Sequence, residues 1–565
     1  MNLSQQKRER MLSFLKQLKT ETKTDEDLIA LNEIENELLS KKYGLIWEQH
    51  EENVDIKMKT EIPVFTEIEE LKINDNKESD YYNFLLEGDN LHSLKLLEKT
   101  HRGKIGLIYI DPPYNTGNKD FIYEDSMIGQ DDGFRHSKWL SFMSERLIIA
   151  SKLLSDEGMI LISIDDNEFA QLKLLCDEIF GENNLLANMV WQSTPGSNTG
   201  TNIITVTEYI LVYAKNKAKC KTNTIEINDD TKYKLEDEYV ERRGRYVLNK
   251  MDRRMTGSHY SDSLNYPIEM PDGQLVYPGS TTYKSTDNWN YRWSKPKIEW
   301  GIENGFIVFK NVKGKWNVYF KQYYKVDNND NIIQRRLPFQ NLVKLEQFNS
   351  TQGTREIMTI FNGKKFDYPK PLGLIKYLID ICPDKNITVL DFFAGSGTTG
   401  HAVLQLNAED KGNRRFILCT NNENNICREI TYERVRAAIL GKCINNEELN
   451  KPLLSNLKYY KTDFIPKISN DNYYLSDELL KHIKEMVQLE NGVALDGENY
   501  ILLLSDEEAD ILEKKPNKLK NCKGIYISSD VFLTSSQQKL FRDIEIKQIP
   551  DYYFEDELRE VGEIW

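Results

Sequence analysis

The sequence predicts an α/β fold in which a mostly parallel β-sheet carries helices on both faces. Four short runs are apolar at nearly every position: Lys104–Ile110, Met159–Ile164, Ile387–Leu390 and Phe416–Cys419. Continuously apolar strands are buried on both faces, which is typical of parallel sheets rather than of sheets with one wet face. A glycine-rich segment after the third run, described below, supports the same fold class.

The runs form two blocks, and each block contains a helical pattern between its two strands. The expected helices run from Trp139 to Leu154 and from Thr399 to Leu406. A strand, a helix and a parallel strand make the crossover unit of α/β proteins. Strands of one sheet need not be contiguous in sequence. We therefore expect one sheet built from both blocks, with the segment 216–356 inserted between them as a separate domain.

The first 60 residues are expected to form two helices. Apolar residues recur there at the three- and four-residue spacing of one helix face. They are Met11, Leu12, Leu15 and Leu18 in the first helix, and Leu28, Leu31, Ile34 and Leu38 in the second. This helical pair is either an interaction arm or a packed extension, and the pattern favours neither.

The C-terminal part of the chain is expected to form a small α/β domain. Tyr500–Leu504 and Gly524–Ile527 have the composition of buried strands. Four acidic residues between them predict an acidic surface: Asp506, Glu507, Glu508 and Asp510. This domain either docks a partner subunit or completes the fold.

Length and composition exclude several classes of protein. The chain has 565 residues, of which 39% are hydrophobic and 29% are charged. These values are unlike those of disordered tails, collagen-like chains and small disulfide proteins. The seven cysteines form no CxxC pair, so reduced thiols are expected and a zinc site is not. We expect Cys419 and Cys427 to be structural rather than nucleophilic.

No targeting or membrane segment is evident in the sequence. The first residues lack the apolar core of a signal peptide, and no run approaches the ~18 apolar residues of a membrane span. We therefore expect a cytoplasmic protein without a membrane partner.

The charge of the chain is unevenly distributed. The net charge of −15 argues, as an average, against a simple basic nucleic-acid coat protein. From Tyr283 to Glu356, however, 13 Lys and Arg stand against 7 Asp and Glu, whereas residues 451–565 have 15 against 22. Positive charge is therefore expected to concentrate in the inserted segment.

The inserted segment also combines clustered arginines with aromatic residues. The arginines lie at Arg242–Arg245 (RRGR), Arg253–Arg254 and Arg335–Arg336. The aromatic residues are Trp289, Trp293, Trp300, Trp316, Tyr283, Tyr291, Tyr323 and Tyr324. This composition favours nucleic-acid contact. The alternative is an ordinary β-rich domain with solvated lysines.

The sharpest motif follows the strand that ends at Ile110. It reads Asp111-Pro112-Pro113-Tyr114, and open α/β sheets bind ligands at the carboxyl ends of their strands. Prolines donate no N–H, so the carbonyls of Asp111 and Pro112 and the Asp111 carboxylate are expected to accept hydrogen bonds. With the Tyr114 ring as a stacking face, they would grip an exocyclic amino group on a flat heterocycle such as adenine. The alternative is a turn with a structural tyrosine.

The second motif, DFFAGSGTTG, spans Asp391 to Gly400 between an expected strand and an expected helix. Gly395, Gly397 and Gly400 match GxGxxG in the context that makes the pattern meaningful. Such glycines let the backbone approach a ligand, and the helix N-terminus attracts an anion. NAD or FAD would need an acidic residue about 20 positions on. Glu423 fits that spacing loosely, so the loop alone leaves the cofactor open.

The two motifs together favour an amino-group methyltransferase. Such an enzyme needs a clamp for the acceptor amine and a helix N-terminus for the methionine carboxylate of S-adenosylmethionine. A dinucleotide oxidoreductase has no need for the amine clamp. No covalent enzyme intermediate and no metal ion are required.

DPPYNTG at Asp111–Gly117 and DFFAGSGTTG resemble the catalytic and cofactor motifs of amino DNA methyltransferases. The order of the motifs, with a long insert between them, is that of the β class. The resemblance implies the Rossmann-like fold of S-adenosylmethionine-dependent methyltransferases. It also implies that the insert is a target recognition domain and that an adenine is flipped out of duplex DNA and methylated at N6.

Two shorter matches extend the expected cofactor site. Phe366–Pro371 (FDYPKP) is similar to the PKP element of the family, and Leu86–Leu91 (LEGDNL) to the GDNL element before DPPY. The expected catalytic residues are Asp111, Pro112, Pro113 and Tyr114. The expected cofactor-binding residues are Asp89, Lys370, Asp391, Phe392, Ala394, Gly395, Ser396, Gly397, Thr398 and Glu423. Many β-class enzymes have an acidic residue where this chain has Thr420-Asn421, so Asn421 or Asn422 is an alternative to Glu423 for holding the ribose.

Further local matches resemble the modification subunits of type III restriction–modification systems. They are Lys42–Glu48, Tyr291–Ser294, Thr354–Glu356 and Thr420–Glu423. This resemblance implies a prokaryotic, nucleoid-associated enzyme that acts on double-stranded DNA. A homodimer is expected, and a separate restriction subunit with helicase and nuclease activity would be its partner, because this chain has no GxxxxGK[ST] phosphate loop.

With this resemblance the chain divides into five expected domains. They are a helical arm (1–60), a catalytic half (61–215), a target recognition domain (216–356), a cofactor half (357–450) and a C-terminal domain (451–565). Two rival functions remain. An N4-cytosine methyltransferase also needs an amine clamp, although its motif usually begins with serine. A non-catalytic DNA-specificity subunit would not need the intact motifs.

Overall fold

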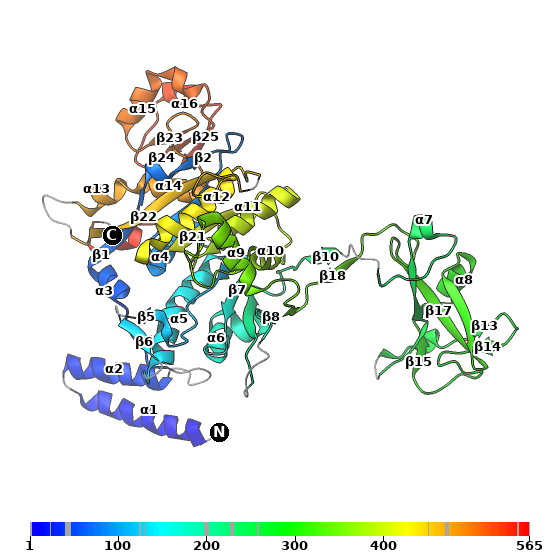
Figure 1. The fold of residues 1–565 in the computed structure, drawn as a ribbon. Helices are drawn as coiled ribbons and strands as arrows, with labels where there is room; N and C mark the ends of the chain where they lie inside the picture. Colours follow the sequence, from blue (N-terminus) through cyan, green and yellow to red (C-terminus); the bar gives the residue numbers. More distant parts are fainter. Residues whose placement is uncertain are drawn as a thin grey trace. The chain divides into compact units, whose positions relative to one another are not determined.

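The structure, a computed structural model, shows two compact units (Figure 1). Unit 1 comprises Met1–Thr222 and Gln340–Trp565, and unit 2 comprises Asn223–Phe339. The residues that the structure describes are 3–22, 24–39, 47–123, 126–129, 132–196, 203–226, 231–256, 259–449, 451–468, 474–550 and 553–563.

Unit 1 is built around an eleven-stranded sheet. Its strands follow one another in the order β1 (Glu61–Glu67), β22 (Asn456–Pro466), β3 (Asn83–Glu87), β21 (Arg415–Thr420), β20 (Thr388–Asp391), β4 (Ile105–Ile110), β7 (Leu154–Ile164), β9 (Thr207–Ala214), β8 (Leu185–Gln192) and β19 (Leu342–Val343), and β2 (Ile73–Asn74) pairs with β22. The expected mostly parallel sheet and the single sheet formed by both blocks of the sequence are confirmed.

The six strands from β22 to β7 are all parallel. From β4 the chain moves to β7 on one side, whereas from β20 it moves to β21 on the other side. The boundary between β20 and β4 is therefore the topological switch point, where open α/β sheets bind their ligands. Beyond β7 the direction reverses, because β9 runs antiparallel to both β7 and β8.

Helices cover the sheet in two groups. The first consists of α4 (Asn90–His101), α5 (Arg135–Leu153), α6 (Phe169–Cys176) and α14 (Ile483–Asn491), and the second of α9 (Ser350–Phe361), α10 (Leu372–Ile379), α11 (Thr398–Asp410) and α12 (Glu433–Leu440). Helices contact one another within each group. Because crossovers are right-handed, α5 and α11, whose crossovers run in opposite directions, lie on opposite faces of the sheet.

Apolar burial explains why the central strands form. Every residue of β3, β4 and β20 is buried, and together with one face of α4 and α5 these strands form the main core of unit 1. Helices shorter than about 12–15 residues are marginal in isolation, so the packing of their apolar faces supplies most of their stability.

The remaining helices and strands of unit 1 come from the two ends of the chain. At the N-terminal end are α1 (Leu3–Glu21), α2 (Asp25–Leu39) and α3 (Asn53–Thr60), and Lys19 of α1 pairs with Glu35 of α2. The C-terminal end has α13 (Leu475–Leu480), α15 (Asp506–Glu513), α16 (Ser535–Leu540) and α17 (Glu555–Glu560), with a parallel sheet of β23 (Tyr500–Leu503), β24 (Gly524–Ile527) and β25 (Glu545–Gln548). This small sheet has its own apolar core.

Short elements complete unit 1. A hairpin of β5 (Asn118–Tyr123) and β6 (Ser126–Gly129) follows the DPPY motif. Single turns of helix are η1 (Glu69–Leu71), η2 (Asp177–Gly181), η3 (Glu182–Asn184), η6 (Glu423–Asn425), η7 (Ile426–Tyr432) and η8 (Pro516–Leu519). Among the described residues, no helix is both long and apolar enough to cross a membrane.

Unit 2 consists of small antiparallel sheets around its own core. Its strands are β10 (Thr224–Glu226), β11 (Tyr246–Lys250), β12 (Asp252–Arg254), β13 (Ile268–Glu269), β14 (Leu275–Val276), β15 (Trp289–Tyr291), β16 (Ile307–Val312), β17 (Lys315–Tyr323) and β18 (Arg336–Pro338), and its helices are α7 (Val240–Arg243), η5 (Asp262–Leu264) and α8 (Lys295–Glu303). Its first strand, β10, pairs with its last strand, β18.

Unit 2 is narrower than the insert 216–356 expected from composition. Residues 340–356 belong to unit 1, because β19 extends the edge of the main sheet beside β8 and α9 packs on α10 and α12. The composition of this stretch does not reveal the change, since a two-residue edge strand leaves no periodic pattern.

Candidate functional site

The DPPY motif lies at the switch point of the main sheet. Asp111 follows β4 directly, and Asp391 ends the neighbouring strand β20. Because parallel strands end at the same edge, the catalytic loop (Asp111–Asn115) and the glycine loop (Asp391–Gly397) face the same part of the molecule. The structure thus brings the two predicted motifs together.

Four polar side chains form a cluster in front of β4. The Lys370 ammonium lies 2.9 Å from Asp111 Oδ1, 3.3 Å from Glu208 Oε2 and 2.8 Å from the Tyr114 hydroxyl. The Tyr114 hydroxyl lies 2.9 Å from Asp111 Oδ1 and 3.0 Å from Glu208 Oε2. Lys370, expected from the PKP element to line a cofactor site, therefore places its amine among the catalytic residues.

Glu208 is a member of this cluster that sequence reasoning missed. It is the second residue of β9, which runs antiparallel to β7 with Tyr209 opposite Ile164. Reversal of this one strand brings its beginning, rather than its end, to the carboxyl edge of the parallel strands. The sequence shows a glutamate at the start of an apolar run, but strand direction cannot be read from periodicity.

Burial and charge together set the protonation of the cluster. Burial favours the neutral form of Lys370, but the Asp111 and Glu208 carboxylates outweigh it, so the pKa of this lysine is raised. Burial, followed by the same two carboxylates, raises the pKa of Tyr114 well above its ordinary value. At neutral pH the cluster therefore holds an ammonium group and a neutral phenol.

The catalytic loop is held from behind by two buried contacts. The Trp139 indole donates a hydrogen bond of 2.7 Å to the Pro113 carbonyl. The side-chain amide of Asn115, which is fully buried at a φ of 56°, donates to Glu168 at 2.5 Å. His136 also lies 2.6 Å from Glu168, and burial raises the pKa of Glu168 to about 8. These residues position the loop, and no sequence motif identified them.

The glycine loop turns tightly from β20 into α11. Gly397 has a φ of 75° and precedes the first residue of α11. A Cβ at this position would lie 3.0 Å from the Thr431 carbonyl. Gly400 packs the helix against the sheet, because a Cβ there would lie 3.0 Å from Leu418. Gly400 thus has the helix-packing role that the third glycine of the GxGxxG pattern predicts.

Asp391 of the glycine loop points into the protein. Its carboxylate accepts a hydrogen bond of 3.0 Å from the Phe393 amide and one of 2.5 Å from the Thr399 hydroxyl. The residue is only 2% exposed, and burial raises its pKa to about 7. In this structure the side chain stabilises the loop from within.

A buried arginine that the sequence analysis did not identify supports the other side of the loop. Arg434 of α12 donates to the hydroxyls of Thr398 at 2.6 Å and Ser396 at 3.1 Å, and pairs with Glu356 at 3.1 Å. Glu356 in turn accepts from the Leu372 amide at the start of α10. Burial lowers the pKa of Arg434 to about 10. Phe392 and Ala394 are also buried in this loop.

Asp89 caps the helix that follows β3. Its carboxylate accepts a hydrogen bond of 2.8 Å from the Leu91 amide. The next residue, Asn90, donates to the Phe392 carbonyl at 2.8 Å and accepts from the buried Arg146. The GDNL element is thus joined to the glycine loop, and Asp89 remains part-exposed beside it.

Glu423 lies on an exposed turn beyond β21. It begins η6, in which Asn424 and Asn425 both have positive φ angles. Asn422 accepts a hydrogen bond from the Arg428 amide. The structure places Glu423 near the carboxyl end of β21, one strand from β20, which is where a ribose contact is expected to come from.

The donor set of this edge fits a cofactor that carries a carboxylate. The first amides of α11 have no acceptor within the helix, and the helix dipole makes its N-terminus attractive to an anion. Gly395 and Gly397 both have positive φ angles, which the tight turn into α11 requires. The cluster of Lys370, Asp111, Glu208 and Tyr114 lies at the end of β4, the strand next to β20. A methyl donor and an amine acceptor can therefore meet at the switch point.

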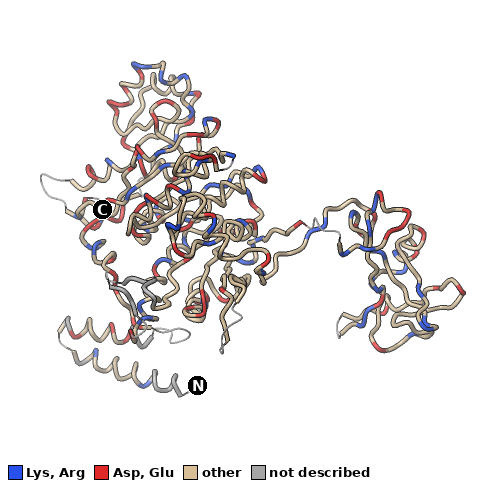
Figure 2. The backbone as a smooth tube through the Cα atoms, in the orientation of Figure 1, with Lys and Arg blue, Asp and Glu red and all other residues tan. Residues whose placement is uncertain are grey.

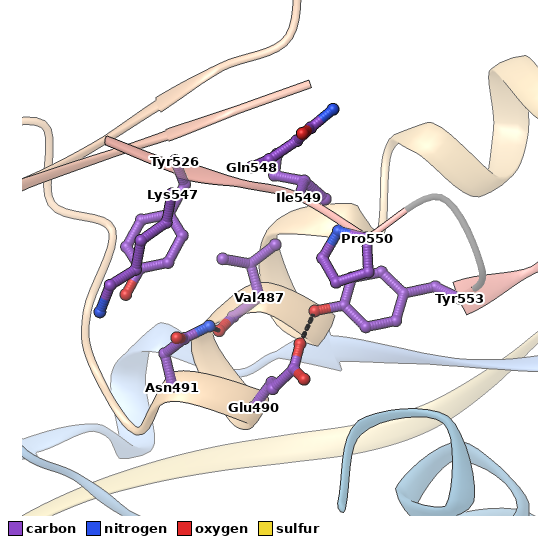
Figure 3. A pocket seen from close by; sticks show the side chains of 9 residues that line it. All are labelled: Val487, Glu490, Asn491, Tyr526, Lys547, Gln548, Ile549, Pro550 and Tyr553. Atoms are coloured by element: carbon purple, nitrogen blue, oxygen red, sulfur yellow. Dashed lines mark hydrogen bonds between the residues drawn. The ribbon is translucent and has the colours of Figure 1, made fainter. Parts of the chain in front are cut away.

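Two other cavities lie away from the motifs. One of about 320 Å³ is lined by residues of α14 and of the C-terminal sheet, among them Glu490 and Tyr526 (Figure 3). The Tyr553 hydroxyl bonds to Glu490 at its wall. A second cavity of about 440 Å³ lies beside Arg355 and Glu356. Neither is lined by residues of the catalytic or glycine loop.

Cysteines and metal-ligand groups add no second site to the part of the chain that the structure describes. All seven cysteines are free thiols. Burial raises the pKa of Cys419 well above its ordinary value and that of Cys427 to about 12, so neither is poised as a nucleophile. No group of three or more His, Cys, Asp and Glu among the described residues is arranged to hold a metal ion.

The arginines and aromatic residues of unit 2 are largely engaged in its own structure. Arg243 is buried and pairs with Asp330, and Arg336 pairs with Glu226. The core of the unit contains Tyr291, Trp293 and Tyr323, with Trp300 and Trp316 packed against it. The aromatic pattern is thus mainly a core pattern. Arg253 and Arg254 on β12 remain exposed.

The charge of unit 2 is positive but modest. Residues 223–339 contain 19 Lys and Arg against 16 Asp and Glu, a net charge of +3, which leaves −18 on the rest of the chain. Figure 2 shows both signs of charge mixed along the tube of each unit. The contrast between the two parts of the chain confirms the uneven distribution. The positive excess is smaller over the whole of unit 2 (+3) than over residues 283–356 (+6).

Comparison with known proteins identifies the family. The profile of the family described as DNA methylase matches residues 105–440, which is more than half of the chain and includes both motifs. The Mod subunit of the type III restriction–modification enzyme StyLTI from Salmonella typhimurium is 34% identical over 441 residues, covering 70% of this chain and 62% of that protein. The chain thus aligns with less than two thirds of this relative.

The type II methyltransferase M.KpnI from Klebsiella pneumoniae is 34% identical over 445 residues, covering 76% of this chain and 98% of that protein. Among solved structures, the cytosine-N4-specific PvuII DNA methyltransferase aligns with 68% of this chain and 100% of its own, at 13% identity and a TM-score of 0.33. Since that score is low, the assignment depends on the family profile and the sequence relatives. The chain belongs to the N6/N4 DNA methylase family.

Proposed function

We propose that this protein is a site-specific DNA methyltransferase that transfers a methyl group from S-adenosylmethionine to N6 of an adenine in double-stranded DNA. The observation that carries the proposal is the meeting of the amine-binding cluster at Asp111 and the glycine loop at one switch point. Family membership and 34% identity to M.KpnI support it.

The residues at β4 are proposed to bind and orient the acceptor amine. The target base lies inside the stack, so it must be flipped out, at a cost of a few kcal/mol. Asp111 and the Pro112 carbonyl accept hydrogen bonds from the N6 hydrogens, and Tyr114 stacks on the base. Pro113 and its bond from Trp139 hold the loop in place. Orientation of the nitrogen supplies much of the rate enhancement.

The residues at β20 are proposed to hold the methyl donor. S-adenosylmethionine supplies a methyl group on a positively charged sulfur. Backbone amides at Ser396 and Thr398 lie at the N-terminus of α11, where a carboxylate is favoured, whereas the Gly397 amide donates to the Ala394 carbonyl at 2.8 Å. The remaining expected contacts come from Asp89 and Glu423 on the neighbouring strand ends.

Adenine is proposed over cytosine because the motif begins with Asp111. In the family that the sequence resembles, N4-cytosine enzymes usually begin this motif with serine. Both bases present an exocyclic amine, so an N4-cytosine methyltransferase is the second candidate. A non-catalytic specificity subunit is disfavoured, because the amine cluster and both loops are intact.

Methylome sequencing tests the proposal. Genomic DNA of a host that carries this gene should contain N6-methyladenine at one sequence motif, and the same host without the gene should not. Because the method reports base, position and sequence together, N4-methylcytosine would identify the second candidate. Unmodified DNA with a soluble, folded protein would refute the proposal.

Unit 2 is proposed to be the target recognition domain. Its entry and exit strands, β10 and β18, pair with each other, so the unit can be exchanged at these strands. Replacing residues 223–339 by the matching segment of a relative should change the methylated sequence. An unchanged sequence motif in a chimera that methylates DNA would contradict this assignment.

The DNA contacts are proposed to include exposed positive side chains such as Arg253 and Arg254 on β12. Phosphate contacts release counterions, so log Kd should change steeply and linearly with the logarithm of salt concentration. Replacing both arginines by alanine should reduce that slope by about 2. A flat salt titration of the unaltered protein would count against DNA as the partner.

The resemblance to Mod subunits extends the proposal to partners. We infer a homodimer that associates with a separate restriction subunit and works in the prokaryotic nucleoid. StyLTI and EcoPI relatives are named Mod subunits of type III enzymes. Sedimentation of the purified protein, alone and with a restriction subunit encoded beside its gene, measures both associations.

A further inference from the structure

We propose that Glu208 is a catalytic residue: with Asp111 it binds the hydrogens of the target amine, and it takes the proton that methyl transfer releases. This inference rests on the proposed function and deepens it, because Glu208 belongs to no motif named above. It comes from β9, the one strand beside the site that runs against its neighbour β7.

The side chain of Lys370 shows where a nitrogen atom can bind in this site. The Lys370 ammonium is surrounded by three oxygen acceptors, which belong to Asp111, Glu208 and Tyr114, at 2.9, 3.3 and 2.8 Å. Each distance suits a nitrogen that donates a hydrogen or pairs with a carboxylate. The site is therefore built to bind a positively charged nitrogen.

The target nitrogen acquires that character during methylation. N6 of adenine is neutral and planar before the reaction. When it forms a fourth bond, to the methyl carbon, it becomes positively charged and tetrahedral, like an ammonium group. A site with two carboxylates around one nitrogen stabilises this state more than the neutral amine, and such differential stabilisation accelerates a reaction.

The charges and atoms of the step balance with two carboxylates. The N6 lone pair forms a bond to the methyl carbon as the bond from that carbon to the sulfur of S-adenosylmethionine breaks, and the sulfur keeps the electron pair as a thioether. The nitrogen now carries two hydrogens and one positive charge. One proton passes to Glu208, which becomes neutral and later releases it to water, and Asp111 retains the other hydrogen bond.

Lys370 must leave this position when the base enters. Its backbone carbonyl accepts from the Thr398 hydroxyl of the glycine loop at 3.4 Å, while its side chain reaches Asp111 and Glu208. As the Lys370 ammonium leaves, the N6 amine of the base takes its place. The Asp111 and Glu208 carboxylates therefore always have a partner that is positively charged or donates hydrogen bonds. Unpaired buried carboxylates would otherwise be costly.

The test compares Glu208→Gln with the wild type in single-turnover methyl transfer to a duplex that carries the target sequence. Glutamine can accept a hydrogen bond but cannot take a proton at neutral pH. We expect the rate to fall at least 100-fold, in the range of general-base effects. Glu208→Asp keeps the carboxylate, so its rate should be at least tenfold higher than that of Glu208→Gln. Glu157→Gln, on the exposed start of β7, is the matched control.

Two further measurements separate chemistry from folding and binding. The unfolding midpoint in urea should be unchanged in Glu208→Gln, because Lys370 keeps its pair with Asp111. Fluorescence of 2-aminopurine at the target position reports base flipping without cofactor, and its amplitude should stay within threefold of the wild type. Loss of the flipping signal together with activity would show that Glu208 acts in binding only, which would overturn the proposal.

The remaining outcomes are also decisive. If the wild type methylates its target and Glu208→Gln does so within threefold of the same rate, the inference is wrong and the proposed function stands. If the wild type methylates no DNA in the host, the proposed function fails and this inference fails with it.

Discussion

Asp111 and Asp391 occupy equivalent places on neighbouring strands and have opposite surroundings. Both stand at the carboxyl end of a buried parallel strand, on either side of the switch point. Asp111 turns toward Lys370 and Tyr114, with about a quarter of its side chain exposed. Asp391 is 2% exposed and accepts hydrogen bonds from Phe393 and Thr399 of its own loop.

This difference shows that the first residue of such a motif can accept hydrogen bonds from its own loop instead of pointing outward. The loop after Asp111 is held from outside, by Trp139 and Glu168, and the Asp111 carboxylate pairs with Lys370. The loop after Asp391 is held from outside by Asn90 and Arg434, and from within by its own aspartate, which accepts from Phe393 and Thr399. In the proposed function Asp111 orients the acceptor amine, whereas Asp391 holds the glycine loop.

The largest effect is expected from Asp111→Ala. Methyl transfer should fall by about 10³-fold or more, because both orientation and charge stabilisation of the amine are lost. DNA binding and the free energy of unfolding should change little, since Lys370 keeps its pair with Glu208 and the Asp111 side chain is about a quarter exposed. Asp156→Ala, on the exposed start of β7, is the control. Full activity of Asp111→Ala would contradict the proposal that Asp111, unlike Asp391, acts on the acceptor amine.

Asp391→Ala should act on stability first. It leaves the Phe393 amide and the Thr399 hydroxyl without their acceptor, and each buried unpaired group costs about 1–3 kcal/mol. We expect the free energy of unfolding in urea to fall by about 2–5 kcal/mol, with cofactor affinity falling as the loop loosens. A variant of unchanged stability that no longer binds S-adenosylmethionine would instead make Asp391 a ligand contact.

Gly397→Ala sharpens the same comparison from the backbone. The backbone of this residue has a φ of 75°, and the added Cβ would lie 3.0 Å from the Thr431 carbonyl oxygen. We therefore expect the free energy of unfolding to fall by about 1–2 kcal/mol. Gly103→Ala is the matched control, because Gly103 has a φ of 68° with nothing within 4 Å of the added Cβ. Equal losses in the two variants would mean that the contact contributes nothing.

The smallest effect is a pH dependence carried by Asp391. Its pKa of about 7 in the folded protein lies above the value near 4 of an unfolded aspartate. Between these values the folded state binds the extra proton, so this group makes stability fall as pH rises from about 4 to about 7. The stability difference between wild type and Asp391→Asn should shrink across that window, by at least about 1 kcal/mol, and stay constant above it. Urea titrations at several pH values measure it.

The fold was predictable where apolar burial leaves a mark. The runs at Lys104–Ile110, Met159–Ile164, Ile387–Leu390 and Phe416–Cys419 correspond to β4, β7, β20 and β21 within a few residues. Two strands of the C-terminal sheet, β23 and β24, were also predicted, whereas the third, β25, was not. These elements are detectable because a strand buried on both faces has a composition unlike that of any loop.

The candidate site was predictable only in part. Asp111, Tyr114 and the glycines follow predicted strands directly, so the fold class was enough to place them. Glu208 and Arg434 reach the site from segments distant in sequence, through an antiparallel strand and a second helix. Strand direction and helix docking are tertiary properties, and no local pattern records them.

Unit 2 illustrates the opposite error. Its aromatic residues suggested a nucleic-acid surface, but Tyr291, Trp293 and Tyr323 are the core that a small unit with short strands needs. Large rings bury much area each, which suits a unit of this size. The same residue types serve either purpose, and only their burial distinguishes the two.

The pairing of β10 with β18 has a consequence for the chain as a polymer. These strands stand at the beginning and the end of unit 2 and hold its two ends about one strand spacing apart, ~5 Å. Unit 2 thus closes its own loop, and the strands β9 and β19 of unit 1 are joined by a tether whose effective length is short. Lengthening or shortening the sequence inside unit 2 therefore leaves the conformational entropy of assembling unit 1 almost unchanged.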